Sequence, residues 1–231
     1  MRKLIILFSI LFGLTILQSS ALNFDGSNDY AYRTSVSGAN FSSTNQITIE
    51  AYFKLDNNNS YDGVVSMNAS GGCCHYRIML INYHIYYNAG QHTDQYAPTS
   101  FTFSNNTWYH YVMVVNGGGN ATFYINGQQI HSSSAGVPSV LPNPINLYIG
   151  TGEYGGVHAF DGLIDEVRIW NTARSQAQIQ STMNSPLSGN ESGLVAYYNF
   201  EQGSGSTVSD QSGNGNHITI SGATWSNNGV N

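Results

Sequence analysis

Short segments in which apolar and polar residues alternate, each closed by a turn, constrain this chain more than any other feature. In segment 47–55, the apolar set that alternates with polar residues is Ile47, Ile49, Ala51, Phe53 and Leu55. A period of two predicts a strand with one buried face and one solvent-facing face. Segment 121–126 alternates in the same way and ends at Asn126-Gly127, a dipeptide that favours a tight hairpin.

Further strands are predicted where β-branched and aromatic residues gather between turn signals. These segments are 64–67, 77–82, 85–88, 100–103, 108–115, 145–149, 162–170 and 194–200. One short helix is expected after Ser175, because Ser175 and Gln178 form a capping box and Pro186 follows. Many short strands with a single helix predict an all-β fold, an antiparallel sandwich or barrel.

The N-terminus is typical of an export signal. Arg2 and Lys3 precede an apolar stretch over residues 4–17, and Ser19-Ser20-Ala21 offers small residues for cleavage. We therefore predict a signal peptide over residues 1–21 and one domain over residues 22–231. The alternative is a membrane anchor, but the stretch is shorter than the ~20 residues that a span needs, and no other apolar run would cross a membrane after cleavage. The protein is expected to be secreted, or to lie at the cell surface or in a periplasm.

Composition excludes two classes of protein. Charged residues make up only 9% of the chain and aromatic residues 13%, which disfavours a disordered polyelectrolyte. The formal net charge of −6 disfavours a general nucleic-acid binder, so no nucleic-acid partner is expected.

The two cysteines are neighbours, Cys73 and Cys74. In an oxidising compartment they are expected to form a vicinal disulfide that stiffens a loop. Free thiols, pairing between chains, and a metal site with His75 are the alternatives.

The predicted strand 162–170 contains a residue that breaks its own pattern. Its odd positions from residue 163 onward are apolar except Asp165, which places that carboxylate on the core side. A buried carboxylate needs hydrogen bonds, a cation or a metal. Bonds to backbone N–H groups of a nearby turn would serve as well as a metal. Glu166 and Arg168 share the other face and could pair at the surface for little gain in stability.

Seven motifs in order carry a family resemblance. They are segments 22–30, 47–53, 108–110, 123–127, 160–171, 193–198 and 210–216. In this order they resemble the laminin-G-like (concanavalin A-like) jellyroll family. The resemblance implies an all-β, two-sheet antiparallel jellyroll sandwich, here with one short helix.

The resemblance also implies a structural calcium ion between an early turn and a later strand. Carried over to this chain, its ligands are Asp25, Gly26, Asp29 and Asp165. Calcium takes six to eight oxygen ligands, which suits carboxylates and a main-chain carbonyl. The alternative is that Asp25 and Asn28 shape the turn through Asx hydrogen bonds.

Catalytic motifs are missing from the sequence. The E-x-D-x-x-E strand motif of the family's glucanases does not occur, nor do G-x-S-x-G and H-E-x-x-H. The chain is therefore expected not to be an enzyme, with a glycoside hydrolase kept as the second alternative.

Aromatic and amide side chains that suit sugars concentrate between residues 61 and 96. The candidate ligand-binding residues are Tyr61, Tyr83, Tyr86, Asn88, His92 and Tyr96. Ordinary packing of strand aromatics is the alternative. The predicted function is non-catalytic recognition of an extracellular glycan or glycosylated surface, with a protein–protein or adhesion module as the first alternative.

Overall fold

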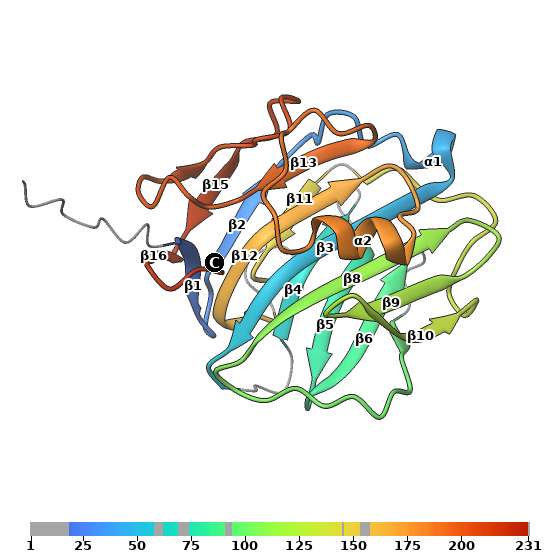
Figure 1. Cartoon of the computed structure of the whole chain (residues 1–231), viewed down its shortest axis with the longest axis horizontal. Helices are drawn as coiled ribbons and strands as arrows, with labels where there is room; N and C mark the ends of the chain where they lie inside the picture. The colour runs from blue at the N-terminus through green and yellow to red at the C-terminus, as the bar shows by residue number, and fades with distance from the viewer. Residues whose placement is uncertain are drawn as a thin grey trace, which may run out of the picture.

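The computed structural model describes residues 19–57, 62–68, 74–90, 94–144, 146–152 and 158–230, with the side chains of Cys74 and His75 left out. Two antiparallel eight-stranded sheets face each other, which confirms the all-β jellyroll sandwich (Figure 1). The first sheet is ordered β10-β9-β8-β3-β12-β1-β16, and β13 pairs with β12. Its strands are β1 (Ala21–Asp25), β3 (Gln46–Leu55), β8 (Trp108–Asn116), β9 (Ala121–Ile125), β10 (Gln128–Ser133), β12 (Asp161–Trp170), β13 (Leu194–Tyr198) and β16 (Thr224–Ser226).

The second sheet is ordered β14-β15-β2-β11-β4-β5-β6-β7. Its strands are β2 (Tyr30–Arg33), β4 (Asp62–Asn68), β5 (Cys74–Ile81), β6 (His84–Ala89), β7 (Gln95–Tyr96), β11 (Asn146–Ile149), β14 (Thr207–Val208) and β15 (Ile218–Ser221). The core lies between the sheets, where the alternating apolar set of β3 is fully buried. Within the described residues, no helix is long and apolar enough to cross a membrane.

Local turn and cap signals were read correctly in two places. Asn126 and Gly127 both have positive φ, 49° and 73°, as the hairpin between β9 and β10 requires. Helix α2 (Gln176–Thr182) carries the complete capping box of Ser175 and Gln178. The predicted helix after Ser175 is confirmed, and the structure adds α1 (Phe41–Thr44), a single turn that ends at Asn45 in the left-handed conformation.

The strand predicted at residues 100–103 was wrong, because this segment is irregular. Phe101 and Phe103 pack their rings on Tyr109, with centroids 5.6 and 5.0 Å away. Backbone N–H groups here bond to side chains rather than to a neighbouring strand. The N–H of Phe101 donates to Thr99 Oγ1, and the N–H of Ser104 donates to Tyr109 Oη. Apolar residues thus mark ring packing here rather than strand pairing.

The second face of β3 corrects the expectation of a solvent-facing surface. Thr48 and Glu50 are fully buried, and Tyr52 is nearly so. Helix α2 lies across this side of the first sheet (Figure 1), where Ile179 packs on Val112 and Val114 of β8. Both faces of β3 are therefore covered.

Glu50 is the centre of a buried group of charges on that covered face. Arg174 Nε lies 3.1 Å from Glu50 Oε1, His110 Nε2 lies 3.3 Å from Oε2, and Arg168 Nη1 lies 3.9 Å from Oε2. Burial alone would raise the pKa of Glu50, but these partners together bring it below the usual value. The carboxylate therefore stays charged and joins β3 to β12 and to the segment that leads into α2.

Replacing Glu50 with Ala should destabilise the protein by about 3–5 kcal/mol, because it leaves Arg174 without the carboxylate that it contacts and Arg168 with Glu166 alone. Urea unfolding measures the loss. Glu201→Ala removes an exposed carboxylate and serves as the matched control, with an expected change within ~0.5 kcal/mol. Equal effects of the two substitutions would show that the buried group does not hold this face together.

Candidate functional site

Strand register places one row of side chains on the outer face of the second sheet. Tyr32, Tyr148, Ser66, Arg77 and Asn88 lie directly opposite one another across β2, β11, β4, β5 and β6. The next row along the strands is wholly core and consists of Ala31, Ile149, Val65, Ile78 and Tyr87. Because successive residues of a strand point to opposite faces, the first row points away from the core.

Tyrosines cluster at one end of this row. The rings of Tyr32 and Tyr148 stack at an angle of 19° with centroids 6.4 Å apart, and Tyr30 lies 5.6 Å from Tyr32. Tyr148 is buried beneath the others, whereas Tyr30 and Tyr32 are partly open to solvent. This end thus offers aromatic surface on a rigid base.

A second aromatic group lies beyond the other end of the row. Tyr86 of β6 pairs with Tyr96 of β7, and their ring centroids are 5.3 Å apart. The ring of His84 meets Tyr96 edge-on at 5.7 Å. Tyr96 is 45% exposed, so its ring is accessible to a ligand. We call the outer-face residues of the second sheet the tyrosine face: Tyr30, Tyr32, Ser66, Arg77, Tyr86, Asn88, Tyr96 and Tyr148.

The centre of the tyrosine face is polar and held in place. Arg77 is ion-paired with Asp94, and its Nη1 also donates to the carbonyl of Gly152 at 3.3 Å. Ser66 Oγ donates to the carbonyl of Thr151 at 3.1 Å. Asn88 Oδ1 accepts from the N–H of Gly90. The Arg77–Asp94 pair cancels its own charge, so the face combines aromatic rings at its two ends with a polar centre that is buried at Ser66, Arg77 and Asn88.

The structure brings together three of the six ligand-binding residues predicted from sequence. Tyr86, Asn88 and Tyr96 lie on the tyrosine face. Tyr83 instead occupies the β5–β6 turn with φ of 64°, packs against the core, and donates its hydroxyl to Asn105 Oδ1. Tyr61 and His92 lie outside the described residues.

Sequence reasoning missed Tyr30, Tyr32, Tyr148 and Arg77 as site residues. The alternation Tyr30-Ala31-Tyr32 was the available signal. Nothing local shows that β2 pairs with β11, more than a hundred residues further along the chain.

Asp165 does not lie on the core side, and that prediction was wrong. The pairing of β12 with β3 shifts between Asp165 and Arg168, and Glu166 has φ of 50°. This bulge changes which residues face inward: Ile164 before it and Val167 after it are core. Asp165 is opposite Tyr52 and so points to the outer face of the first sheet.

The carboxyl group of Asp165 is nevertheless fully buried. Its Oδ1 accepts from the N–H of Glu166 at 2.7 Å and its Oδ2 from the N–H of Val230 at 2.9 Å. Burial raises the pKa of Asp165 to about 8, against the partial lowering that these hydrogen bonds cause. Backbone N–H groups, the non-metal alternative, therefore satisfy this residue.

The four predicted calcium ligands do not converge. Asp25 pairs with Asp161 across β1 and β12, and Asp165 lies four residues further along β12, about 13 Å away at ~3.3 Å per residue. Asp25, Gly26 and Asp29 do share a turn, in which Asp29 Oδ2 accepts from the N–H of Asp25 and Asp25 Oδ1 from that of Ser27. These hydrogen bonds shape the turn as Asx bonds do. Among the described residues, no group of three or more acidic, His or Cys side chains could hold a metal ion. Calcium stays a prediction, limited to the Asp25–Asp29 turn.

Two further predictions fall on parts of the chain that the structure does not describe. Residues 1–18 of the predicted signal peptide (residues 1–21) lie outside the described residues. Ser19 to Ala21 are described, and Ala21 is the first residue of β1, paired with Ser226. Cys73 is outside them, and only the backbone of Cys74 is described, as the first residue of β5, so the disulfide stays a prediction.

Comparison with known proteins assigns a family. The family model Laminin_G_3, described as the concanavalin A-like lectin/glucanases superfamily, matches residues 25–180. No curated protein matches the chain.

Solved structures share the fold at low sequence identity. A protein from Bacteroides ovatus ATCC 8483, provisionally described as carbohydrate-binding, superposes with a TM-score of 0.69 and 21% identity over 90% of this chain. The chain spans 59% of that protein. A heptameric SAP-like pentraxin from Limulus polyphemus gives a TM-score of 0.58 and 13% identity, with 73% of this chain and 84% of the pentraxin covered. A Trypanosoma rangeli sialidase gives a TM-score of 0.53 and 16% identity, with 70% of this chain and 27% of the sialidase covered.

The raised pKa of Asp165 makes stability depend on pH. The folded carboxyl keeps its proton up to about pH 8, whereas the unfolded chain releases it near the usual value of 3.8. The native protein should therefore lose stability between these values, by up to about 1.4 kcal/mol per pH unit.

The Asn variant of Asp165 has no proton to lose. Its free energy of unfolding, measured in urea, should rise relative to that of the native protein as pH increases through this window. If the difference in free energy of unfolding between the two proteins does not vary with pH, Asp165 is already ionised in the folded protein.

Calcium binding is checked by thermal melting with calcium and with a chelator. A bound ion stabilises by about 2.7 kcal/mol at a hundredfold excess over its dissociation constant. Because Asp165 lies far from the turn, any calcium-dependent shift should persist in Asp165→Asn and disappear in Asp29→Asn. A shift abolished by Asp165→Asn would contradict the placement of these residues.

Proposed function

The chain belongs to the concanavalin A-like lectin/glucanase superfamily, and on that premise we propose that it is a non-catalytic recognition domain that binds glycans through its tyrosine face. The tyrosines that are open to solvent at the two ends of the in-register row from Tyr32 to Asn88 are the observation that carries this proposal, because the row itself is buried at Tyr148, Ser66, Arg77 and Asn88. The row crosses five strands, and four strand spacings of ~4.8 Å give a span of about 19 Å. That length suits an extended oligosaccharide rather than a single ring.

The chemistry of the face matches that of a neutral sugar chain. Tyrosine rings cover the apolar faces of sugar rings and keep a hydroxyl for hydrogen bonding. Tyr30 and Tyr32 offer such rings at one end, and Tyr86 and Tyr96 offer them at the other. Between them, Ser66 and Asn88 are buried and hydrogen-bonded within the protein, so the sugar would be held by the rings and hydroxyls of the tyrosines.

Rigidity supports the same assignment. The tyrosines sit on strands rather than loops, and Tyr148 stacks under Tyr32. Arg77 is fixed by Asp94 and Gly152. A binding surface whose side chains are already held loses little conformational entropy when a ligand binds. The Bacteroides ovatus protein of the same fold, provisionally described as carbohydrate-binding, supports the ligand class.

The proposal treats the domain as a binder and not as an enzyme. Hydrolysis of a glycosidic bond needs two carboxyl groups that face the same bond. On the tyrosine face the carboxylate of Asp94 is committed to Arg77. Export through a signal peptide over residues 1–21 would bring the face to extracellular glycans and is part of the same proposal. So is a structural calcium ion at the Asp25–Asp29 turn.

A glycan array, followed by titration calorimetry on the glycans that bind, tests the proposal. Tyr96→Ala should weaken binding by about tenfold, because the exposed ring loses its contact with a sugar face. Val140→Ala is the matched control: Val140 is the other exposed large hydrophobic residue among those described, and it is not part of the tyrosine face. The glycan affinity of the Val140→Ala variant should equal that of the native protein.

Three outcomes would overturn the proposal. Full affinity in the Tyr86→Ala/Tyr96→Ala double variant would exclude the tyrosine face. Turnover of a labelled glycan would make the chain a glycoside hydrolase. Capture of a defined protein partner with no glycan signal would make it an adhesion module.

A further inference from the structure

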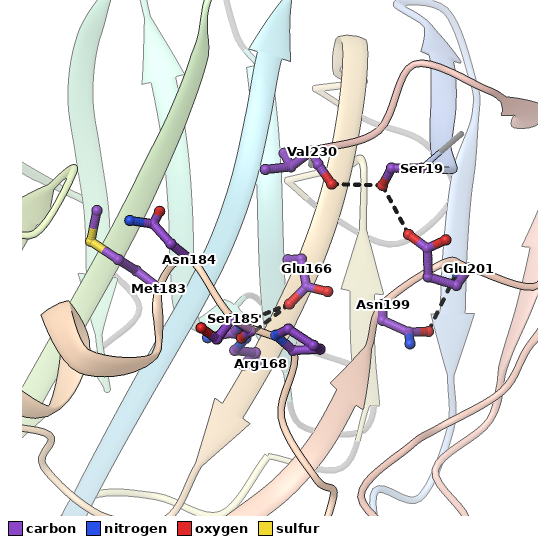
Figure 2. Close-up of a pocket in the computed structure, with 10 residues that line it drawn as sticks. Ser19, Glu166, Arg168, Met183, Asn184, Ser185, Asn199, Glu201 and Val230 are labelled. Carbon is purple, nitrogen blue, oxygen red and sulfur yellow. Dashed lines mark hydrogen bonds and ion pairs between the residues drawn. The ribbon is translucent and has the colours of Figure 1, made fainter. Parts of the chain in front are cut away.

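A separate pocket lies on the opposite side of the sandwich, on the outer face of the first sheet (Figure 2). Its volume is about 440 Å³, within the ~300–1,000 Å³ of small-molecule sites. Residues of β12, the segment after α2 and the segment after β13 line it. The tyrosine face does not extend into it, so the pocket needs an explanation of its own.

The wall of the pocket is fixed by buried hydrogen bonds. Arg168 is almost fully buried and donates to the carbonyl of Thr182 and to that of Ser185, both at 3.0 Å. Tyr52 Oη donates to the carbonyl of Met183 at 3.0 Å. The end of α2 and the loop after it are thus held at a set distance from β12, and Met183 and Pro186 add apolar surface to the lining.

A β-bulge directs an acceptor into this pocket. Glu166 sits in the bulge with φ of 50°, and Figure 2 shows its carboxylate beside Arg168. Arg168 Nη2 lies 2.6 Å from Glu166 Oε2, and the hydroxyl of Tyr197 donates to Oε1 at 2.8 Å. The expected pairing of Glu166 with Arg168 is confirmed, but it is largely buried rather than at the surface.

A second carboxylate faces the pocket from the segment after β13. Glu201 is exposed. Its Oε1 accepts from Ser19 Oγ at 2.8 Å in the full chain, and removal of the proposed signal peptide would take this donor away. Asn199 lies beside it and adds an amide (Figure 2). Together with Glu166 these groups make a lining rich in hydrogen-bond acceptors next to an apolar wall.

We propose that this pocket binds a short neutral saccharide as a second site, independent of the tyrosine face. Sugar hydroxyls would donate to Glu201, Glu166 and Asn199, while an apolar ring face would pack on Met183 and Pro186. Hydrogen bonds from neutral donors to carboxylates are stronger than those between neutral groups. The size of the pocket limits the ligand to a short saccharide.

Charge sets the selectivity of the pocket. Its lining holds two carboxylates and one guanidinium, whose N–H groups already bond Glu166, Thr182 and Ser185. A uronic or sialic acid would bring a further carboxylate next to Glu201 with no cation to meet it. Neutral sugars should therefore bind and acidic sugars should not.

The signal of the Met183 methyl group in NMR spectra of methyl-labelled full chain reports binding directly; Met183→Leu assigns it. A panel of neutral mono- and disaccharides is titrated, with glucuronic acid and sialic acid as the acidic arm. At least one neutral sugar should give a saturable shift of this methyl signal, and the acidic sugars should give none. Glu201→Ala should weaken that binding about tenfold or more without changing the melting temperature.

Tyr96→Ala separates this site from the tyrosine face. It should leave the Met183 titration unchanged even where it abolishes binding on the array, so each site can fail without the other. The pocket proposal is overturned if no neutral sugar shifts the Met183 signal, if acidic sugars bind as well as neutral ones, or if Glu201→Ala has no effect on affinity.

Discussion

The burial of Glu50 between Arg168, Arg174 and His110 is the interaction on which the layout of this molecule depends. A charged carboxylate inside a protein is tolerated only when cations and hydrogen-bond donors surround it. Here the two guanidinium groups and the imidazole come from β12, the segment before α2 and β8, so their contacts with Glu50 fix that segment against the first sheet. The guanidinium of Arg174 also stacks over Trp170, 3.9 Å from the ring centroid.

The packing of α2 and its flanking segments on the first sheet decides which surfaces stay open to a ligand. The outer face of β3 lies under α2 and its flanking loops, and a pocket lies where the loop after α2 approaches β12. The second sheet carries no helix in the described part of the chain, and its outer face keeps aromatic and neutral polar side chains. The positions of the proposed recognition site on the second sheet and of the pocket on the first follow from one packing arrangement.

Local rules predicted most of the longer strands, the hairpin at Asn126-Gly127 and the cap of α2, because each depends on a few neighbouring residues. The same rules failed where distant segments decide. The alternation in segment 47–55 cannot show that α2 covers the polar side. One extra residue in the bulge at Asp165 reverses the side to which the following residues point, and periodicity alone gives no sign of it.

The candidate site was found in part for the same reason. Tyr86 and Tyr96 stood in an aromatic stretch and were recognised there. Tyr32 and Tyr148 join them only through the pairing of β2 with β11 and of β11 with β4. Four ligands carried over from the family motif did not converge, since the turn at Asp25 and the bulge at Asp165 occupy different places along β12.

Oxidative footprinting of the tyrosines, with and without a glycan that binds, tests the central claim most directly. The tyrosine-face account predicts that Tyr32, Tyr86 and Tyr96 become protected together, while Tyr83 in the β5–β6 turn keeps its reactivity. Protection confined to tyrosines outside the tyrosine face, or no protection at saturating glycan, would contradict it.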